Sequence, residues 1–255
     1  MKRIKLMAAA AAIVAMACGT AMATPSTQIW IPSTDAKDFK NIHIDIDNYA
    51  RFSGSGEADT GANMYNLGLS AGVLPLESLK LEVGVDFLKQ SSSSAPNADN
   101  NPFYFNAKLA TPEDAFGLKG LPAFAVGTQS IGSVPETKYN IVYGLTAKTL
   151  PVIGRVSIGG YTGDKDLLGS GSNAGVLASL DRNIPEISDK LWLAVDYMGG
   201  TSGGGKNTNG ALGVGGSWAF SKQISLIVGA VFFNPFQEDK SGKPTLTTQI
   251  DISLP

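Results

Sequence analysis

The stretch Leu79-Lys80-Leu81-Glu82-Val83-Gly84-Val85-Asp86-Phe87 alternates strictly between an apolar side chain and a charged residue or glycine. Successive side chains of a β-strand point to opposite faces, so this segment would present one apolar and one polar face. The apolar face consists of Leu79, Leu81, Val83, Val85 and Phe87, and the polar face carries Lys80, Glu82 and Asp86. Such a strand is suited to separating a hydrophobic medium from water.

Comparable alternating segments recur along the chain and are separated by turn-forming residues. The expected strands cover residues 41–53, 64–74, 79–90, 102–111, 122–131, 138–148, 152–163, 173–183, 189–199, 208–219, 222–233 and 244–254. Each is near the length of a tilted membrane-crossing strand. The pattern predicts an all-β chain, a transmembrane antiparallel up-and-down β-barrel of about twelve strands. A soluble β-sandwich would also alternate, but strands of roughly ten residues are longer than the typical globular strand.

The connections between these segments are unequal. Links after the even-numbered strands are mostly tight turns, whereas links after the odd-numbered strands are mostly longer and polar, such as 54–63, 91–101 and 235–243. Short turns at one end and long loops at the other are typical of outer-membrane barrels. This asymmetry would place both ends of the barrel domain on the periplasmic side.

The first 23 residues have the organisation of a cleavable secretory signal. A basic start, Met1–Lys5, precedes an apolar run to Ala17, and Ala21-Met22-Ala23 supplies the small-x-small cleavage pattern. Acylation of Cys18 as a lipoprotein is the competing interpretation, although Met16 fits the required pattern poorly. Cleavage after Ala23 would remove the only cysteine, and with it disulfides and thiolate chemistry.

Composition then limits the partners and the domain plan. Cleavage would leave 17 of the 20 Lys+Arg and all 22 Asp+Glu, a formal charge of −5 that argues against a nucleic-acid partner. After residue 23 the longest apolar runs, such as Leu226–Phe233, have only strand length, which excludes a helical membrane protein. We expect residues 24–40 to form an N-terminal periplasmic segment or plug, and 41–255 to form the barrel.

Alternation also assigns faces in other strands. Tyr139, Ile141, Tyr143 and Leu145 are expected to face lipid, as are the alternate apolar residues of the ninth and twelfth strands. The fifth and eleventh strands are ambiguous, because Ile224–Phe233 is apolar on both faces. Aromatic residues near strand ends are placed as an interfacial girdle would be: Phe103, Tyr139, Tyr197, Trp218 and Phe232.

Together, the leader, the dozen alternating strands and the unequal links resemble the bacterial outer-membrane β-barrels of the porin-like class. The resemblance is architectural, covers nearly all of the chain after residue 23, and points to no specific characterised family. It implies insertion into outer-membrane lipid with the help of the outer-membrane assembly machinery. Many such barrels end in an aromatic residue, whereas this chain ends Ile252-Ser253-Leu254-Pro255. Either the insertion signal is degenerate or the last segment is not the closing strand.

Polar side chains on the inner faces are the candidate pore lining. His43, the only histidine, shares a face with Asp45 and Asp47, a row that could titrate near neutral pH or attract cations, or could simply be a polar lining. The full candidate set is His43, Asp45, Asp47, Lys80, Glu82, Asp86, Lys108, Lys148, Arg155, Asp181, Lys190, Asp196 and Asp251. Its mixed charges favour a channel lining over an active site.

Catalytic, cofactor and metal motifs cannot be named in this chain, and we expect no enzyme. Twelve-stranded outer-membrane lipases carry a serine nucleophile two residues after a histidine, but here that position is Asp45. The stretch 200–207, Gly-Thr-Ser-Gly-Gly-Gly-Lys-Asn, nearly spells a phosphate-binding loop, yet a strand-like segment follows it where that motif needs a helix. It is more simply a surface loop.

Three functions remain open. The first is a porin-like passive channel for small hydrophilic solutes, with a weak preference for cations because the chain is acidic. The second is a structural or adhesive surface barrel that acts through long loops such as 91–101 and 235–243. The third, an outer-membrane hydrolase, lacks a nameable nucleophile–base pair.

Overall fold

The computed structural model describes residues 26–51, 63–89, 96–168, 173–200, 210–233 and 245–255. Twelve strands lie within these ranges: β1 (Ile42–Arg51), β2 (Met64–Gly72), β3 (Lys80–Lys89), β4 (Phe103–Thr111), β5 (Ala123–Gly132), β6 (Ile141–Leu150), β7 (Gly154–Thr162), β8 (Ala174–Asn183), β9 (Leu191–Met198), β10 (Ala211–Ala219), β11 (Ile224–Phe233) and β12 (Thr245–Leu254). Short helices occupy some connections: α2 (Pro96–Asn100), η1 (Ala115–Gly117), η2 (Pro135–Thr137) and α3 (Lys165–Leu168).

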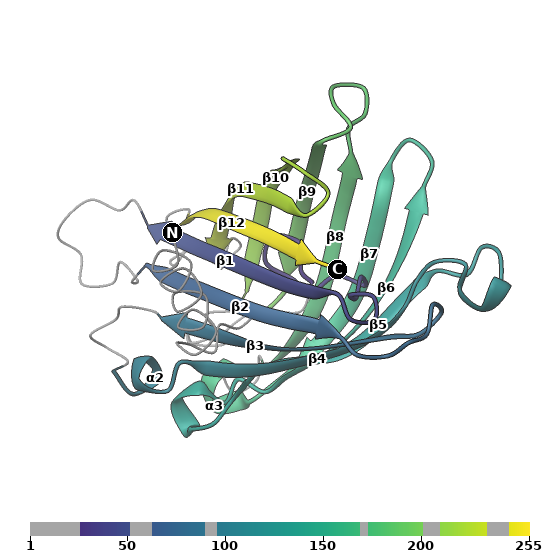
Figure 1. Ribbon diagram of the computed structural model, residues 1–255. Coiled ribbons are helices and arrows are strands. Elements are labelled where there is room, and N and C mark those ends of the chain that lie inside the picture. Colours follow the sequence, from purple (N-terminus) through teal and green to yellow (C-terminus); the bar gives the residue numbers. More distant parts are fainter. Residues whose placement is uncertain (1–25, 52–62, 90–95, 169–172, 201–209, 234–244) are drawn as a thin grey trace, which may run out of the picture.

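Every strand pairs antiparallel with its neighbours in the chain, and β1 pairs with β12 to close the barrel (Figure 1). Each predicted range overlaps one observed strand, in the same order, so the prediction of a twelve-stranded antiparallel barrel is confirmed. Leu254 pairs with Ile42, which makes the last segment the closing strand. In the described part of the chain, none of the helices has the length and apolar character needed to cross a membrane.

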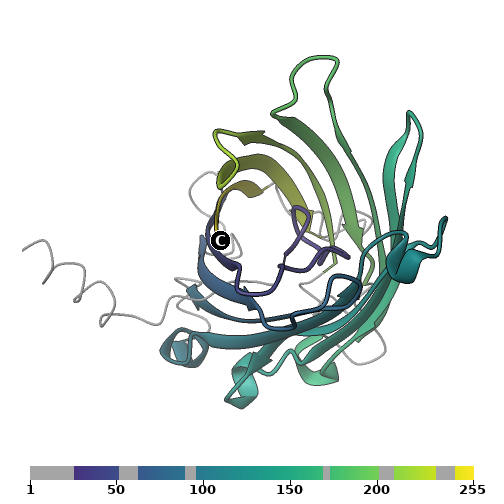
Figure 2. The same ribbon diagram turned by 45° about the vertical axis from the view of Figure 1, so that its right-hand side comes forward.

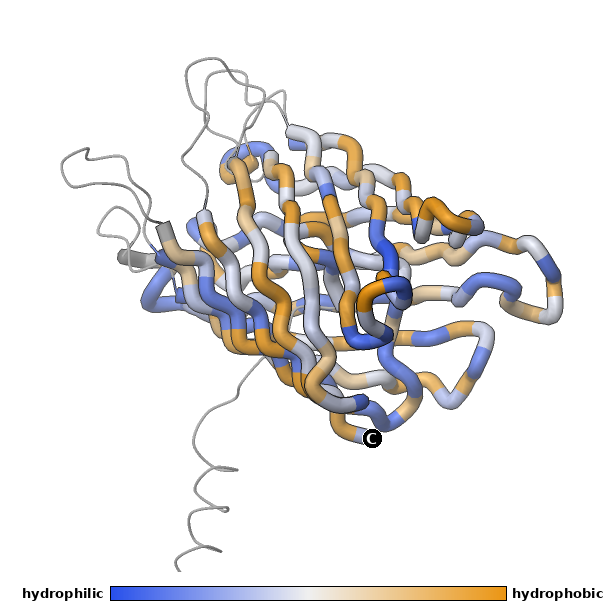
Figure 3. Tube along the Cα trace, turned by 90° about the horizontal axis from the view of Figure 1, so that it is seen from above, coloured by the Kyte–Doolittle hydropathy of each residue, from blue (hydrophilic) through white to orange (hydrophobic). Residues whose placement is uncertain are grey.

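The wall of the barrel separates two environments, as the alternation of β3 predicts. Val83 is 40% exposed on the outer face, whereas the neighbouring Glu82 is fully buried inside. The same alternation of hydrophobic and hydrophilic residues is visible along most strands of the tube in Figure 3. The outer surface is therefore a continuous apolar band, and charges collect in the interior.

Part of the interior is nevertheless apolar. One buried cluster lies against β6, β7 and β8 and comprises Ile31, Ile141, Tyr143, Leu145, Tyr161, Leu168, Leu177 and Met198. A second cluster, which includes Ile29, Tyr49, Ala194, Ala211, Ile227 and Val231, lies on the side of β9 to β11. Both contain an isoleucine from the segment that precedes β1, so this segment reaches both sides of the interior.

The face assignment of β6 was wrong. Ile141, Tyr143 and Leu145 point into the barrel with exposures of 2–4%, while Val142 on the other face is 55% exposed. Tyr139 also packs on the inner apolar cluster. The physical reason is that the interior here is filled by hydrophobic side chains, so the more apolar face of β6 turns inward. Gly127, opposite Tyr143 on β5, leaves room for its ring.

Candidate functional site

Residues 26–41, which we call the inner segment, cross the space enclosed by the strands (Figure 2, purple). The segment is folded into a small hairpin. The Gln28 N–H donates to the Ile31 carbonyl at 2.8 Å, and the Ser33 N–H donates to the Ser26 carbonyl at 3.1 Å. The turn therefore presents the backbone amides of residues 29–31 on one side.

A single carboxylate on β9 receives those amides. Asp196 Oδ2 accepts hydrogen bonds from the backbone N–H groups of Ile29, Trp30 and Ile31 at 2.8, 2.7 and 3.1 Å. Gln249 on β12 donates its side-chain amide to the Ile29 carbonyl at 2.8 Å. Three consecutive amides converging on one oxygen form a small anion-binding concavity, and charge-assisted bonds of this kind are stronger than neutral ones.

The two ends of the hairpin are held by a buried cation on β4. Lys108 Nζ donates to the backbone carbonyls of Ser26 and Asp35, both at 2.6 Å. Glu82 on β3 lies 4.0 Å from the same ammonium, accepts from the Ser26 N–H at 3.2 Å and from the Ser70 hydroxyl at 2.6 Å. Lys108 and Glu82 are both fully buried, so each charge has a partner inside the barrel.

Further ion pairs join the inner segment to the wall. Arg155 on β7 contacts Asp35 at 2.7 Å and also bonds Thr34, while Lys80 on β3 contacts Asp38 at 2.6 Å. Desolvation by the surrounding wall would raise the pKa of Asp35, but its side chain is still 63% exposed, and the hydrogen bond and charge of Arg155, helped by Lys108, lower this pKa below its ordinary value. Asp35 is therefore ionised at neutral pH and keeps its pair with Arg155.

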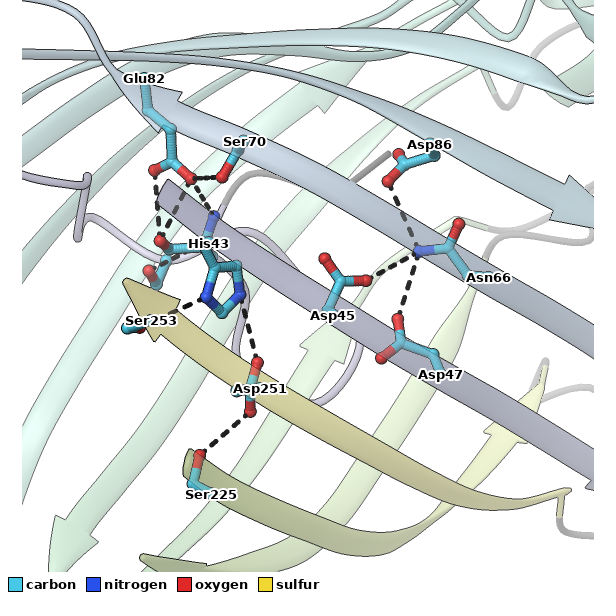
Figure 4. A network of polar contacts seen from close by, with 12 residues as sticks. His43, Asp45, Asp47, Asn66, Ser70, Glu82, Asp86, Ser225, Asp251 and Ser253 are labelled. Carbon is cyan, nitrogen blue, oxygen red and sulfur yellow. Dashed lines mark hydrogen bonds and ion pairs between the residues drawn. The ribbon is translucent and has the colours of Figure 1, made fainter. Parts of the chain in front are cut away.

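The other side of the interior carries the acidic row predicted from β1. Asn66 on β2 donates to Asp45, Asp47 and Asp86 at 3.1, 3.3 and 3.4 Å (Figure 4). Asp86 also accepts from Asn106 on β4 at 2.6 Å. Among the described residues, no group of three or more His, Cys, Asp or Glu side chains is arranged to hold a metal ion. The side-chain amides of Asn66 and Asn106 bridge the carboxylates.

His43 brings a serine and an aspartate together. Its Nε2 lies 3.3 Å from Asp251 Oδ1, and its Nδ1 lies 3.5 Å from Ser253 Oγ (Figure 4). The pairing of β1 with β12, which puts His43 opposite Ser253, explains this proximity. The serine–histidine distance exceeds the 2.6–3.2 Å reach of a typical nucleophile–base pair, so the contact alone does not favour a hydrolase.

A cavity of about 390 Å³ opens between the inner segment and the ends of β8 to β12. Its lining includes Asp181, Asp251, Lys190, Trp192 and Ser217 from the wall, and Gln28 and Asp35 from the inner segment. Gln28 and Trp192 both donate to Asp181, at 2.8 and 3.1 Å. The space is therefore lined by charged residues of both signs together with apolar surface, and it is comparable in volume to small-molecule sites.

The structure brings together most of the residues selected from the sequence, but not all. His43, Asp45, Asp47, Glu82, Asp86, Lys108 and Asp196 are buried inside; Lys80, Arg155, Asp181 and Asp251 are partly exposed there; Lys190 is exposed at the rim of the cavity. Lys148 was placed wrongly. It lies on the outer face of β6 and pairs with Glu113 at 3.0 Å, because the faces of that strand are reversed.

Sequence reasoning missed several residues that organise the site. Asn66 and Gln249 are neutral and alternate correctly on β2 and β12, so their position on the inner face was readable but their role was not. Ile29, Trp30 and Ile31 form part of the segment before β1, where alternation carries no information. Of the glycine-rich stretch 200–207, residues 201–207 lie outside the described residues.

A closed antiparallel barrel of twelve strands with charged side chains in its interior has the architecture of the outer-membrane channels. Among solved structures, an outer membrane channel from Pseudomonas putida F1 is similar at a TM-score of 0.51 and 12% identity, covering 91% of this chain and 100% of that chain. The KdgM porin is similar at a TM-score of 0.52 and 10% identity, covering 84% and 99%. At such identities the likeness shows the fold. No protein-family model and no curated protein matches the chain.

Proposed function

We propose that this protein is a passive, porin-like channel of the bacterial outer membrane for small hydrophilic solutes, and not an enzyme. The observation that carries the proposal is the wall itself, which is apolar outside and carries its buried charged side chains inside, around a cavity of about 390 Å³ lined by residues of both charges. A barrel with this polarity is stable with lipid outside and water inside. The shared fold of the two outer-membrane channels supports it.

The proposed location includes export and insertion. Residues 1–23 would act as a cleaved signal, and the outer-membrane assembly machinery would insert the barrel into outer-membrane lipid. Solutes would pass through the interior, whose acidic row, Asp45, Asp47 and Asp86, favours small cations over anions. His43 and the remaining inner residues would line the path with the mixed charges predicted from the sequence.

Purified protein in planar lipid bilayers tests the proposal. We expect discrete conductance steps, and a reversal potential in a KCl gradient that has the sign of a cation preference. Folding is checked by the gel shift between unheated and heated protein, and heat-unfolded protein is the control. A correctly folded protein that stays silent, including in the variants of the inner segment described below, would contradict the channel function.

The alternative of a surface barrel that acts through its loops depends largely on residues outside the described part of the chain. Of the two loops selected from the sequence, residues 91–95 and 235–243 lie outside the described residues. The same bilayer experiment separates the alternatives, since a loop-mediated function needs no conductance.

A further inference from the structure

The wall holds the inner segment chiefly by its main chain. Asp196 accepts three consecutive amides, Lys108 donates to two carbonyls, and Gln249 donates to a third. These groups come from β9, β4 and β12, which surround the interior. Backbone groups are common to any peptide, so this is the hydrogen-bonding pattern by which proteins bind peptides.

Two hydrophobic side chains fix the register of the segment. Ile29 and Ile31 are only 1% and 0% exposed, and each belongs to a different apolar cluster of the interior. Between them, the Trp30 ring meets Tyr49 edge-on at a centroid distance of 5.5 Å. Gly213 on β10 leaves space for Ile29, since a Cβ there would collide with Asp196 and press on Ile29. The backbone contacts are thus combined with shaped apolar pockets.

Ion pairs add to the backbone hydrogen bonds and the apolar pockets. The segment carries Asp35 and Asp38, and the wall meets them with Arg155 and Lys80. The segment returns to the wall at its far end, where Phe39 bridges to Gly72 and the Lys40 N–H donates to the Gly72 carbonyl at 2.9 Å. Between this rim and the turn at Trp30 the segment belongs to no strand, so noncovalent contacts alone keep it in the lumen.

From these contacts we infer that the barrel interior is a peptide-binding site whose ligand is the chain's own residues 26–38, and that this bound segment obstructs the channel. The inference rests on the proposed channel function. A peptide with two isoleucines flanking an aromatic residue at a tight turn, followed by carboxylates, has the chemistry of the site. Release of the segment widens the path, and a free peptide of the same sequence closes it again.

The first test weakens the site from the wall. Asp196→Asn keeps the shape of the side chain but loses the charge that holds three amides, and we expect single-channel conductance to rise about twofold or more. Asp45→Asn is the control for the loss of a lumenal charge: Asp45 belongs to the acidic row and is bonded to Asn66, not to the inner segment, so this variant should weaken the cation preference without the rise in conductance. Equal changes in the two variants would overturn the inference.

The second test alters only the ligand. The full chain with Ile29→Asp and Ile31→Asp cannot return these positions to their apolar pockets, while every wall residue is unchanged. We expect an increased conductance that falls back when a synthetic peptide with the native sequence of residues 26–38 is added. A scrambled peptide of the same composition should have no effect.

The possible outcomes test the peptide-binding site separately from the proposed channel function on which it rests. If the wild type and all folded variants conduct alike, and the native peptide blocks none of them, the channel stands and the peptide site is wrong. If all folded variants are silent, the channel function fails. A silent wild type together with a conducting Ile29→Asp, Ile31→Asp variant supports both.

Discussion

The two sides of the barrel interior differ in the residues that fill them. On the side of β1, β2 and β3 the inner residues are carboxylates and amides, and the outer residues are aliphatic, as in Asp86 beside Val85. On the side of β6, β7 and β8 a buried apolar cluster occupies much of the interior beside Arg155 and Asp181, and the inner Tyr143 is more deeply buried than its neighbour Val142. The comparison teaches that alternation defines two faces, while the contents of the interior decide which face turns inward.

The largest effect is expected on the apolar side. Tyr143→Ala should lower the free energy of unfolding by about 3–5 kcal/mol, because it empties space in the cluster around Ile31 and Leu177. Val142→Ala removes a residue from the exposed face and should cost far less. Denaturant unfolding in lipid vesicles measures both. A larger loss at Val142 would restore the orientation of β6 predicted from its sequence.

Arginine scanning of the outer face should give the next largest effect. Val83→Arg on β3 and Val142→Arg on β6 should each cost about 2–4 kcal/mol near the middle of the membrane, where a charge lacks water. Gly84→Arg, which points into the interior, should cost less than Val83→Arg. The gel shift between folded and heated protein in vesicles follows all three variants. Equal penalties at Val83 and Gly84 would argue against lipid on the outer face.

Ion selectivity should separate inner from outer charges. Asp86→Asn removes a carboxylate from the acidic row and should shift the reversal potential toward a weaker cation preference. Lys148→Gln changes a charge on the outer face and should leave the reversal potential unchanged. A shift for Lys148→Gln as large as that for Asp86→Asn would place this lysine in the ion path after all.

The smallest expected effect is the change in conductance at acid pH. Because the pKa of Asp35 lies below its ordinary value of 3.8, its pair with Arg155 stabilises the inner segment above that pH and is lost as pH falls through the lowered value. Conductance should therefore gain an acid-induced increase below pH 3.8. Arg155→Gln should lose this increase relative to the wild type, which distinguishes Asp35 from other carboxylates. An identical acid response in both proteins would contradict this role of the pair.

Much of this fold was predictable because a barrel strand is recognised from two local signals, the alternation of apolar and polar side chains and the turn residues at its ends. Strands with charges on one face, such as β3 and β12, were assigned to the correct faces, since water and lipid act on them oppositely. β6 lacked that asymmetry: both of its faces are mainly uncharged until Lys148, so its orientation depended on Ile31 and Leu177, far away in the sequence. Local pattern could not supply that information.

The candidate site was likewise predictable only in part. Asp196 and Lys108 were correctly expected inside because they alternate with apolar neighbours. Their partners could not be predicted, since Asp196 meets amides some 165 residues earlier in the chain. A segment without periodicity gives no indication of where its backbone will lie, and only the assembled wall provides the groups that bind it.

The meeting of β1 with β12 has a kinetic consequence. Every other strand pair joins neighbours in sequence, but this seam joins Ile42 to Leu254, so it carries the largest loop-closure cost and should form late. Until then two strand edges remain open to incorrect pairing. The inner segment contacts both strands of the seam, through the ring of Trp30 against Tyr49 on β1 and through the Ile29 carbonyl, which accepts from Gln249 on β12. It can therefore serve as an internal template that draws the two edges together before the barrel closes.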